Sequence, residues 1–207
     1  MALVTGTSSN DVIDRRGMSP GPGASGDNIQ AKEGNDVVWG GSGNDLIYGE
    51  SGSDTLDGGY GSDIILGGDQ NDSISGGAGN DYLFGEFGAD TLSGGLGSDT
   101  LCGMQSDDVY IHYLGDGAVD HINDDMGPAG NLGNGGGTDI LYFADTYGAD
   151  IVWARYGNDL WITDSYDVAD GTFSDGVIVD SFFSNPLNRI EYVFGGDGNG
   201  FYIGGLT

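Results

Sequence analysis

The chain has 207 residues, including 43 glycines, and its 33 acidic residues outnumber its 5 basic ones to give a formal net charge of −28. This charge excludes nucleic acids and anionic membrane surfaces as partners, because both are bound through clustered lysine and arginine. An apolar content of 37% excludes a disordered acidic chain, so the negative charge must be neutralised, and cations are the candidates.

The N-terminal segment, residues 1–21, holds one copy of a glycine- and aspartate-containing unit at residues 6–14 and an irregular insertion after it. It lacks the charged n-region and apolar h-region of a secretory signal peptide. No apolar run in the chain approaches the ~20 residues that a membrane span requires. We therefore predict neither a cleaved N-terminal signal nor a membrane span. The single cysteine, Cys102, rules out an intrachain disulfide.

Residues 22–111 consist of a nine-residue unit that occurs ten times in register. Residues 40–48 and 76–84 fit the pattern G-G-x-G-x-D-x-U-x throughout, where U is apolar, and such a fixed period indicates a repeat architecture. The aspartates are Asp27, Asp36, Asp45, Asp54, Asp63, Asp72, Asp81, Asp90, Asp99 and Asp108. The side chains two positions later are Ile29, Val38, Ile47, Leu56, Ile65, Ile74, Leu83, Leu92, Leu101 and Tyr110. Departures at the second or fourth glycine are Lys32, Glu50, Gln70, Glu86, Met104 and Ser106.

Each unit divides into a glycine-rich turn of six residues and a strand of three. Glycine permits the positive φ angles that such a turn needs and lets the backbone approach an ion closely. The middle strand residue points inward. If two units make one coil of 18 residues, successive aspartates lie on opposite edges of the array. Because coils stack at the strand spacing of about 4.8 Å, aspartates of alternate units come close enough to share a cation.

These nonapeptides resemble the repeats of the RTX (repeats-in-toxin) family of haemolysin-type calcium-binding proteins, over nearly half of the chain. The resemblance implies an all-β parallel β-roll, a right-handed β-solenoid, in which each Ca²⁺ lies between turns n and n+2. Five turns on each edge leave four gaps, so we expect about eight Ca²⁺ as an upper count. The implied ligands are carboxylates of the ten aspartates and turn carbonyls, including those at Gly40, Gly49, Gly58, Gly67, Gly76, Gly85 and Gly94.

The two outer faces of the roll should differ, because the residues beside the inward side chains are apolar on one face and mostly serine and threonine on the other. An apolar stripe of this size is large for exposure to solvent. We hypothesise that either the C-terminal part of the chain or a second subunit covers it, the latter by self-association. The stripe consists of Leu46, Tyr48, Ile64, Leu66, Tyr82 and Phe84.

Residues 112–207 lose the nine-residue period and contain a glycine-rich loop and short β-like runs. The runs at 138–143, 155–160 and 190–194 resemble the β-rich flank that follows RTX repeats. We expect this region to cap the open end of the roll, and the resemblance implies an uncleaved secretion signal near the C-terminus. The predicted division is thus a segment 1–21, a roll 22–111 and a cap 112–207.

Catalysis is not expected. The sequence contains no H-E-x-x-H zinc motif and no G-x-S-x-G nucleophile elbow. The two histidines, His112 and His121, fit a degenerate last turn, and Cys102 occupies an outward strand position where we expect a buried or covered thiol.

The sequence therefore predicts a non-enzymatic calcium-binding protein that folds on binding Ca²⁺. The resemblance implies export by a type I secretion apparatus to the extracellular space or cell surface. Two alternatives remain open: a secretion and folding module of an exported enzyme, and a calcium-dependent subunit of a surface layer or adhesin. An initial methionine, together with an RTX-like flank that reaches the C-terminus, favours a complete small protein over a fragment.

Overall fold

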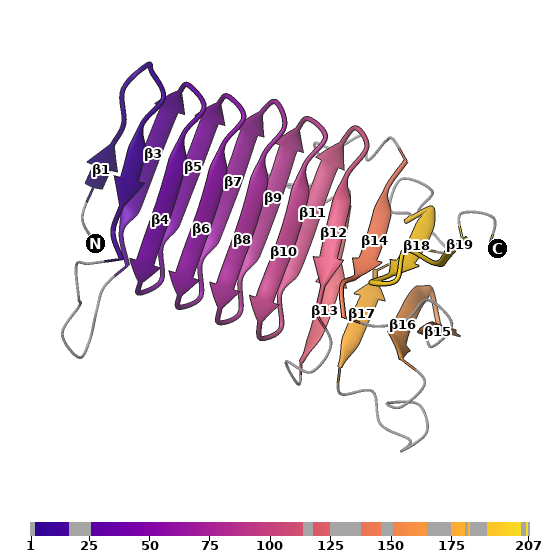
Figure 1. The fold of residues 1–207 in the computed structure, drawn as a ribbon. Coiled ribbons are helices and arrows are strands. Elements are labelled where there is room, and N and C mark those ends of the chain that lie inside the picture. The colour runs from indigo at the N-terminus through magenta and orange to yellow at the C-terminus, as the bar shows by residue number, and fades with distance from the viewer. Residues whose placement is uncertain are drawn as a thin grey trace.

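The computed structural model describes residues 3–16, 26–113, 118–124, 138–145, 151–164, 175–180, 182, 190–203 and 206. Every regular element in these ranges is a β-strand. The described residues contain no helix long and apolar enough to cross a membrane. The chain winds into a stack of coils that builds two largely parallel sheets, and the C-terminal strands follow at one end (Figure 1). The predicted all-β parallel β-roll with a β-rich C-terminal cap is confirmed.

Two long sheets contain all the strands of the described residues. The first sheet contains, in spatial order, β1 (Leu3–Thr5), β3 (Asn28–Glu33), β5 (Leu46–Ser51), β7 (Ile64–Asp69), β9 (Tyr82–Phe87), β11 (Thr100–Gln105), β13 (Val119–Ile122), β17 (Gly176–Val179), β16 (Asp159–Asp164) and β15 (Ile151–Tyr156). The second contains β2 (Val12–Asp14), β4 (Val37–Ser42), β6 (Thr55–Tyr60), β8 (Ser73–Ala78), β10 (Thr91–Leu96), β12 (Val109–His112), β14 (Ile140–Phe143), β18 (Tyr192–Gly195) and β19 (Gly200–Tyr202).

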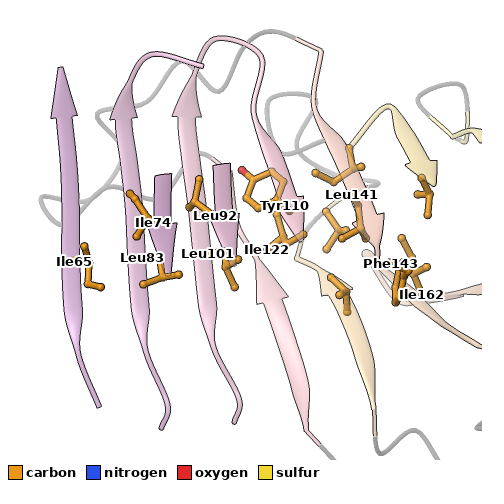
Figure 2. Packing of buried hydrophobic residues seen from close by; sticks show 14 of the residues in the cluster. Ile65, Ile74, Leu83, Leu92, Leu101, Tyr110, Ile122, Leu141, Phe143 and Ile162 are labelled. Atoms are coloured by element: carbon orange, nitrogen blue, oxygen red, sulfur yellow. The ribbon is translucent and has the colours of Figure 1, made fainter. Parts of the chain in front are cut away.

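Each coil adds one strand to each sheet, in a register that repeats every 18 residues. Ile47 pairs with Ile65 in the first sheet, and Leu56 pairs with Ile74 in the second. The inward side chain of every repeat strand is at most 2% exposed, and Figure 2 shows those of the later coils lined up between the sheets. Burying one such aliphatic side chain contributes about 1.5–3 kcal/mol, so this row holds the two sheets together.

The sheets continue across residue 111 without a break. In the second sheet β12 pairs with β14 and β14 with β18, while in the first β11 pairs with β13 and β13 with β17. Ile122, Leu141 and Val193 continue the inward row and are at most 1% exposed. The antiparallel strands β16, β15 and β19 then end the two sheets, so the stack is closed by hairpin-like pairings instead of another open coil.

Six non-glycine residues of the described chain have a positive φ, and all stand where the repeat has its second or fourth glycine. A left-handed backbone costs a residue with a Cβ about 1–2 kcal/mol, so the stacked turns impose this conformation against the local preference. The six are Lys32, Glu50, Gln70, Glu86, Met104 and Ser106, with φ between 72° and 87°.

The apolar stripe on the outer face of the first sheet is only partly covered. Ile64 and Tyr82 are 41% and 51% exposed, whereas Phe84 packs in a small buried cluster with Cys102 and Met104. The described C-terminal strands extend the two sheets at the end of the stack and do not lie across β7 or β9 (Figure 1). The burial of Cys102 confirms the covered thiol that the sequence predicts.

Candidate metal centre

The repeat aspartates form two columns of carboxylates, one along each edge of the roll. Within a column the backbone N–H of each aspartate donates to Oδ1 of the aspartate in the next coil, as from Asp45 to Asp63 at 2.6 Å and from Asp63 to Asp81 at 2.7 Å. The first column contains Asp27, Asp45, Asp63, Asp81 and Asp99. The second contains Asp36, Asp54, Asp72, Asp90 and Asp108.

In the units that open with glycine, the other carboxylate oxygen, Oδ2, lies against that glycine. A Cβ on Gly40 would lie 2.7 Å from Asp45 Oδ2 and 2.6 Å from the carbonyl oxygen of Gly58, the opening glycine of the next coil. We call the space bordered by these atoms a glycine cradle, and a side chain at its glycine would fill it. The cradle glycines of the repeats, each beside the Oδ2 of its own turn, are Gly40, Gly49, Gly58, Gly67, Gly76, Gly85, Gly94 and Gly103.

Most of the repeat aspartates have an Oδ2 atom that is buried and has no hydrogen-bond partner among the described residues. Buried polar atoms are nearly always hydrogen-bonded in folded proteins, and a carboxylate buried without a partner is costly. Each of these atoms therefore marks a place for a partner that the described chain does not supply. They belong to Asp36, Asp45, Asp54, Asp63, Asp72, Asp81, Asp90 and Asp108.

Burial raises the pKa of these carboxyls, and neighbouring carboxylates raise it further. The pKa of Asp63 rises to about 7, that of Asp72 to about 8 and that of Asp108 to about 9, although the backbone N–H bond to each carboxylate acts in the opposite direction. Without a cation, the carboxyls of Asp72 and Asp108 are therefore largely protonated near neutral pH. A cation in the cradles would stabilise the charged form and release the protons.

This set of ligands fits calcium. Ca²⁺ takes about six to eight oxygen ligands from carboxylates and carbonyls, and the cradles offer both kinds of oxygen. Within the described ranges, no three His, Cys, Asp or Glu side chains gather into a metal-binding cluster, so carbonyl oxygens would complete each site. Metals that prefer nitrogen or sulfur, such as zinc, fit this arrangement poorly.

Basic side chains close the first column at both ends. Arg15 donates from Nε and Nη2 to Asp27 Oδ2 at 2.9 and 2.7 Å. Asp120 continues the column by accepting the N–H of Asp99 at 3.0 Å, and His112 Nδ1 lies 2.8 Å from Asp120 Oδ2. In the strand register Arg15 and His112 stand in line with the cradle glycines of the neighbouring coils. Asp27, predicted as a calcium ligand, therefore has its Oδ2 paired with a guanidinium.

The second column extends beyond the repeats in both directions. The N–H of Asp11 donates to Asp36 Oδ1 at 2.6 Å. At the other end the N–H of Asp108 donates to Asp139 Oδ1 at 2.9 Å, and that of Asp139 to Glu191 Oε2 at 2.8 Å. An acidic residue thus occupies every position of this column from Asp11 to Glu191.

The sequence analysis did not find the members of the columns beyond residue 111, because long connections replace the nine-residue turns there. One signal of the repeat nevertheless survives, since each acidic residue is followed two positions later by a buried apolar one. Asp139 is followed by Leu141 and Glu191 by Val193, both fully buried. A search for this three-residue pattern without a fixed period would have found them.

The family model of the RTX calcium-binding nonapeptide repeat matches the chain in four copies, over residues 23–56, 57–92 and 83–110. Residues 23–110 belong to the RTX calcium-binding repeat family. A search of curated proteins found no match to the chain. The RTX repeats make this part of the chain a calcium-binding segment. Their matched range ends two residues before His112, the residue that closes the first column of the roll.

Proposed function

We propose that this protein is exported by a type I secretion system and acts outside the cell or on its surface as a non-enzymatic calcium-binding protein. In this proposal the RTX roll folds as about eight Ca²⁺ bind along its two columns, and the buried Oδ2 atoms without partners support ion binding there. That observation carries the proposal, because the folded turns bring together oxygen ligands that lie far apart in an unfolded chain. The free energy of calcium binding then adds to the free energy of folding.

Most of these oxygens face the gap toward a further repeat turn, whereas that of Asp108 faces the C-terminal region. The gap beside Asp27 is left out of the proposed sites because the Arg15 guanidinium already occupies that cradle. The expected total remains about eight, but its distribution differs from four gaps on each edge.

Export fits this coupling of binding and folding. Extracellular calcium-binding modules work at about 10⁻⁴–10⁻³ M Ca²⁺, far above the concentration in the cytosol. The chain would therefore stay unfolded, and able to pass a narrow channel, until it reaches the outside. There, calcium would neutralise the carboxylate columns and drive folding.

The surroundings of the two histidines support a non-enzymatic role. His112 is 2% exposed, and its Nδ1 and Nε2 lie 2.8 Å and 3.2 Å from carboxylate oxygens of Asp120 and Asp175. His121 Nδ1 lies 3.0 Å from Asp180 Oδ1. Both side chains therefore have structural partners, and His112 has no exposed nitrogen for proton transfer to a substrate.

The test is a calcium titration of the metal-free full chain at pH 8, followed by far-UV circular dichroism with magnesium as the control. A steep gain of β signal with calcium that chelator reverses and magnesium does not reproduce would support the proposal. A folded spectrum that responds to neither calcium nor chelator would refute it.

A second candidate function is calcium-dependent assembly, as in a surface layer or adhesin, and the exposure of Ile64 and Tyr82 favours it. Light scattering at saturating calcium should show a larger particle for the parent chain than for Ile64→Ser/Tyr82→Ser. The matched control is Leu96→Ser, because Leu96 is 59% exposed but lies outside the apolar stripe. A monomeric parent chain at high calcium would exclude assembly through this face.

A further inference from the structure

A groove lies on the outer surface of the second sheet, at residues that the nonapeptide pattern leaves free. It crosses the neighbouring strands β4, β6, β8 and β10 (Figure 1) and encloses about 440 Å³, a volume within the range of small-molecule binding sites. Its walls come from the third and ninth positions of the repeat unit, which supply neither the carboxylate columns nor the inward row. The roll itself therefore does not require the side chains that shape this groove.

The floor of the groove is a row of glycines, so no side chain fills it. Gly41, Gly59 and Gly77 pair in register across β4, β6 and β8. A Cβ on Gly59 or Gly77 would lie 2.3 or 2.2 Å from the carbonyl oxygen of the preceding glycine in the row. Each of these three strands pairs with a strand on both sides, so an extended peptide could not add a strand to the sheet at this place.

The walls are two aromatic side chains and one aliphatic side chain. Tyr60 and Leu96 are 72% and 59% exposed and stand on either side of Ala78, in the row that follows the glycines. Trp39 stands across the glycine row, next to Asp57 in the register of β4 and β6. An exposed aromatic ring offers a large rigid surface on which an apolar face of a ligand can stack.

One carboxylate and one guanidinium are the charged groups of the lining. The Arg16 guanidinium lies over the Trp39 ring, 3.9 Å from its centroid, and Nη2 pairs with Asp14 Oδ2 at 2.9 Å. Burial raises the pKa of the Asp57 carboxyl, whereas the charge of Arg16 and a backbone hydrogen bond from Gly59 act in the opposite direction. The lining thus combines a strong hydrogen-bond donor with a strong acceptor and has no net charge.

We infer that this groove binds a neutral carbohydrate, with one sugar ring against Tyr60 and hydroxyl groups hydrogen-bonded to Asp57 and Arg16. A pyranose ring has apolar C–H groups on its faces and hydroxyl groups around its rim, so it matches an aromatic wall beside a charged acceptor and a charged donor. An anionic ligand would be repelled by the formal net charge of −28, and a cationic one would meet the guanidinium that already covers Trp39.

The same face offers contacts to further sugar rings. Ser75 and Ser93 continue the row of Trp39 and Asp57 across β8 and β10. An oligosaccharide that lies across the strands would therefore meet hydroxyl groups beyond the groove. This inference goes beyond calcium binding, because it gives the outer face of the folded roll a ligand of its own.

The test presents the calcium-saturated full chain, with its β-rich far-UV spectrum verified, to a glycan array of neutral, sialylated and sulfated oligosaccharides. We expect binding to neutral pyranose oligosaccharides. Calorimetric titration with the neutral oligosaccharide that binds best then compares the parent with two variants of the groove. Tyr60→Ala should weaken binding by about tenfold or more through loss of the aromatic contact, and Ala78→Trp should abolish it by filling the groove.

The matched control is Phe87→Ala, because Phe87 is an aromatic residue at the same position of the repeat unit, 54% exposed, but on the first sheet. It should keep the parental affinity. Failure of the folded parent to bind any neutral oligosaccharide would overturn the inference, as would binding to anionic ones alone. Equal affinities of Tyr60→Ala and Phe87→Ala would also overturn it. A parent chain that folds with calcium but binds no carbohydrate refutes the groove alone and leaves the proposed function standing.

Discussion

At the scale of single residues, the positive φ angles of Gln70 and its counterparts show how strongly the stacked turns determine the backbone. Gln70 has a φ of 79° at a position where most repeats have glycine. Its left-handed conformation costs energy that glycine would not incur. The glycines 18 residues before and after it, Gly52 and Gly88, also have positive φ angles, of 141° and 138°, so the stack requires a positive φ at this position.

We predict that Gln70→Gly stabilises the calcium-saturated roll by roughly 0.5–1 kcal/mol, the relief of strain less the greater entropy of glycine in the unfolded chain. The urea midpoint at saturating calcium measures this change. Ala89→Gly is the control, because Ala89 lies in the turn of the next coil and has no positive φ; it should destabilise the roll. A lower midpoint for Gln70→Gly would contradict the prediction.

Substitution of Asp63 should change the stability of the metal-free roll and of the calcium-bound roll in opposite directions. Its carboxyl is fully buried and its pKa is raised to about 7, so the charged form is unfavourable without an ion. Asp63→Asn removes that charge, and we predict more β signal in metal-free buffer at pH 8 but a smaller further gain with calcium and fewer bound ions. The control is Asp69→Asn, which is exposed and should change neither quantity. Equal effects of the two substitutions would argue against ion binding at Asp63.

At the scale of strands and turns, Arg15 occupies a position where the next coils of the same edge have glycine. Its guanidinium bonds Asp27 Oδ2, so we predict that Arg15→Gly opens this cradle and allows one additional Ca²⁺ to bind. Native mass spectrometry would count it. Arg16→Gly removes the same charge from the neighbouring position, where Arg16 pairs with the exposed Asp14, and should leave the count unchanged. If Arg15→Gly binds the same number of Ca²⁺ ions as the parent chain, the idea that calcium can replace the guanidinium at this end is excluded.

The regular elements could be predicted from the sequence because each of their residues has a repeated, local reason. Asp45 and Ile47, for example, have counterparts at the same spacing in every unit, and this spacing alone predicts an edge position for the aspartate and an inward position for the apolar residue. The ends could not be predicted in the same way. Arg15 meets Asp27 across 12 residues and His112 meets Asp175 across 63, so these contacts depend on where long connections return the chain.

At the scale of the whole molecule, the raised pKa values predict an unusual dependence of stability on pH. In the metal-free roll the pKa values of Asp54, Asp63, Asp72 and Asp108 rise from 3.8 to about 6, 7, 8 and 9. Between pH 3.8, the pKa in the unfolded chain, and the raised pKa values of the folded state, the folded state binds more protons than the unfolded chain. The stability of the metal-free roll is therefore highest at acid pH and is lost as the pH rises through the raised pKa values.

We therefore predict that the calcium-free chain gains β signal when it is acidified from about pH 8 to about pH 5, as carboxyls with raised pKa values take up protons. Circular dichroism of dialysed, metal-free protein measures this change. At limiting calcium the same acidification should weaken calcium binding, because protons compete for the carboxylates. Loss of β signal on acidification of the metal-free chain would show that the columns do not control folding.

The 18-residue coil also limits how the array can change in length. A coil contains two units, so gaining or losing a pair leaves every later strand on its own sheet. Loss of a single unit would move every later strand to the other sheet. The outward apolar side chains of these strands would then lie on the serine and threonine face. Arg15 and His112 would stand on opposite edges, so that each column would be closed at one end only. Insertions in such a chain are thus neutral in even numbers of units and disruptive in odd ones, a parity rule comparable to a reading frame.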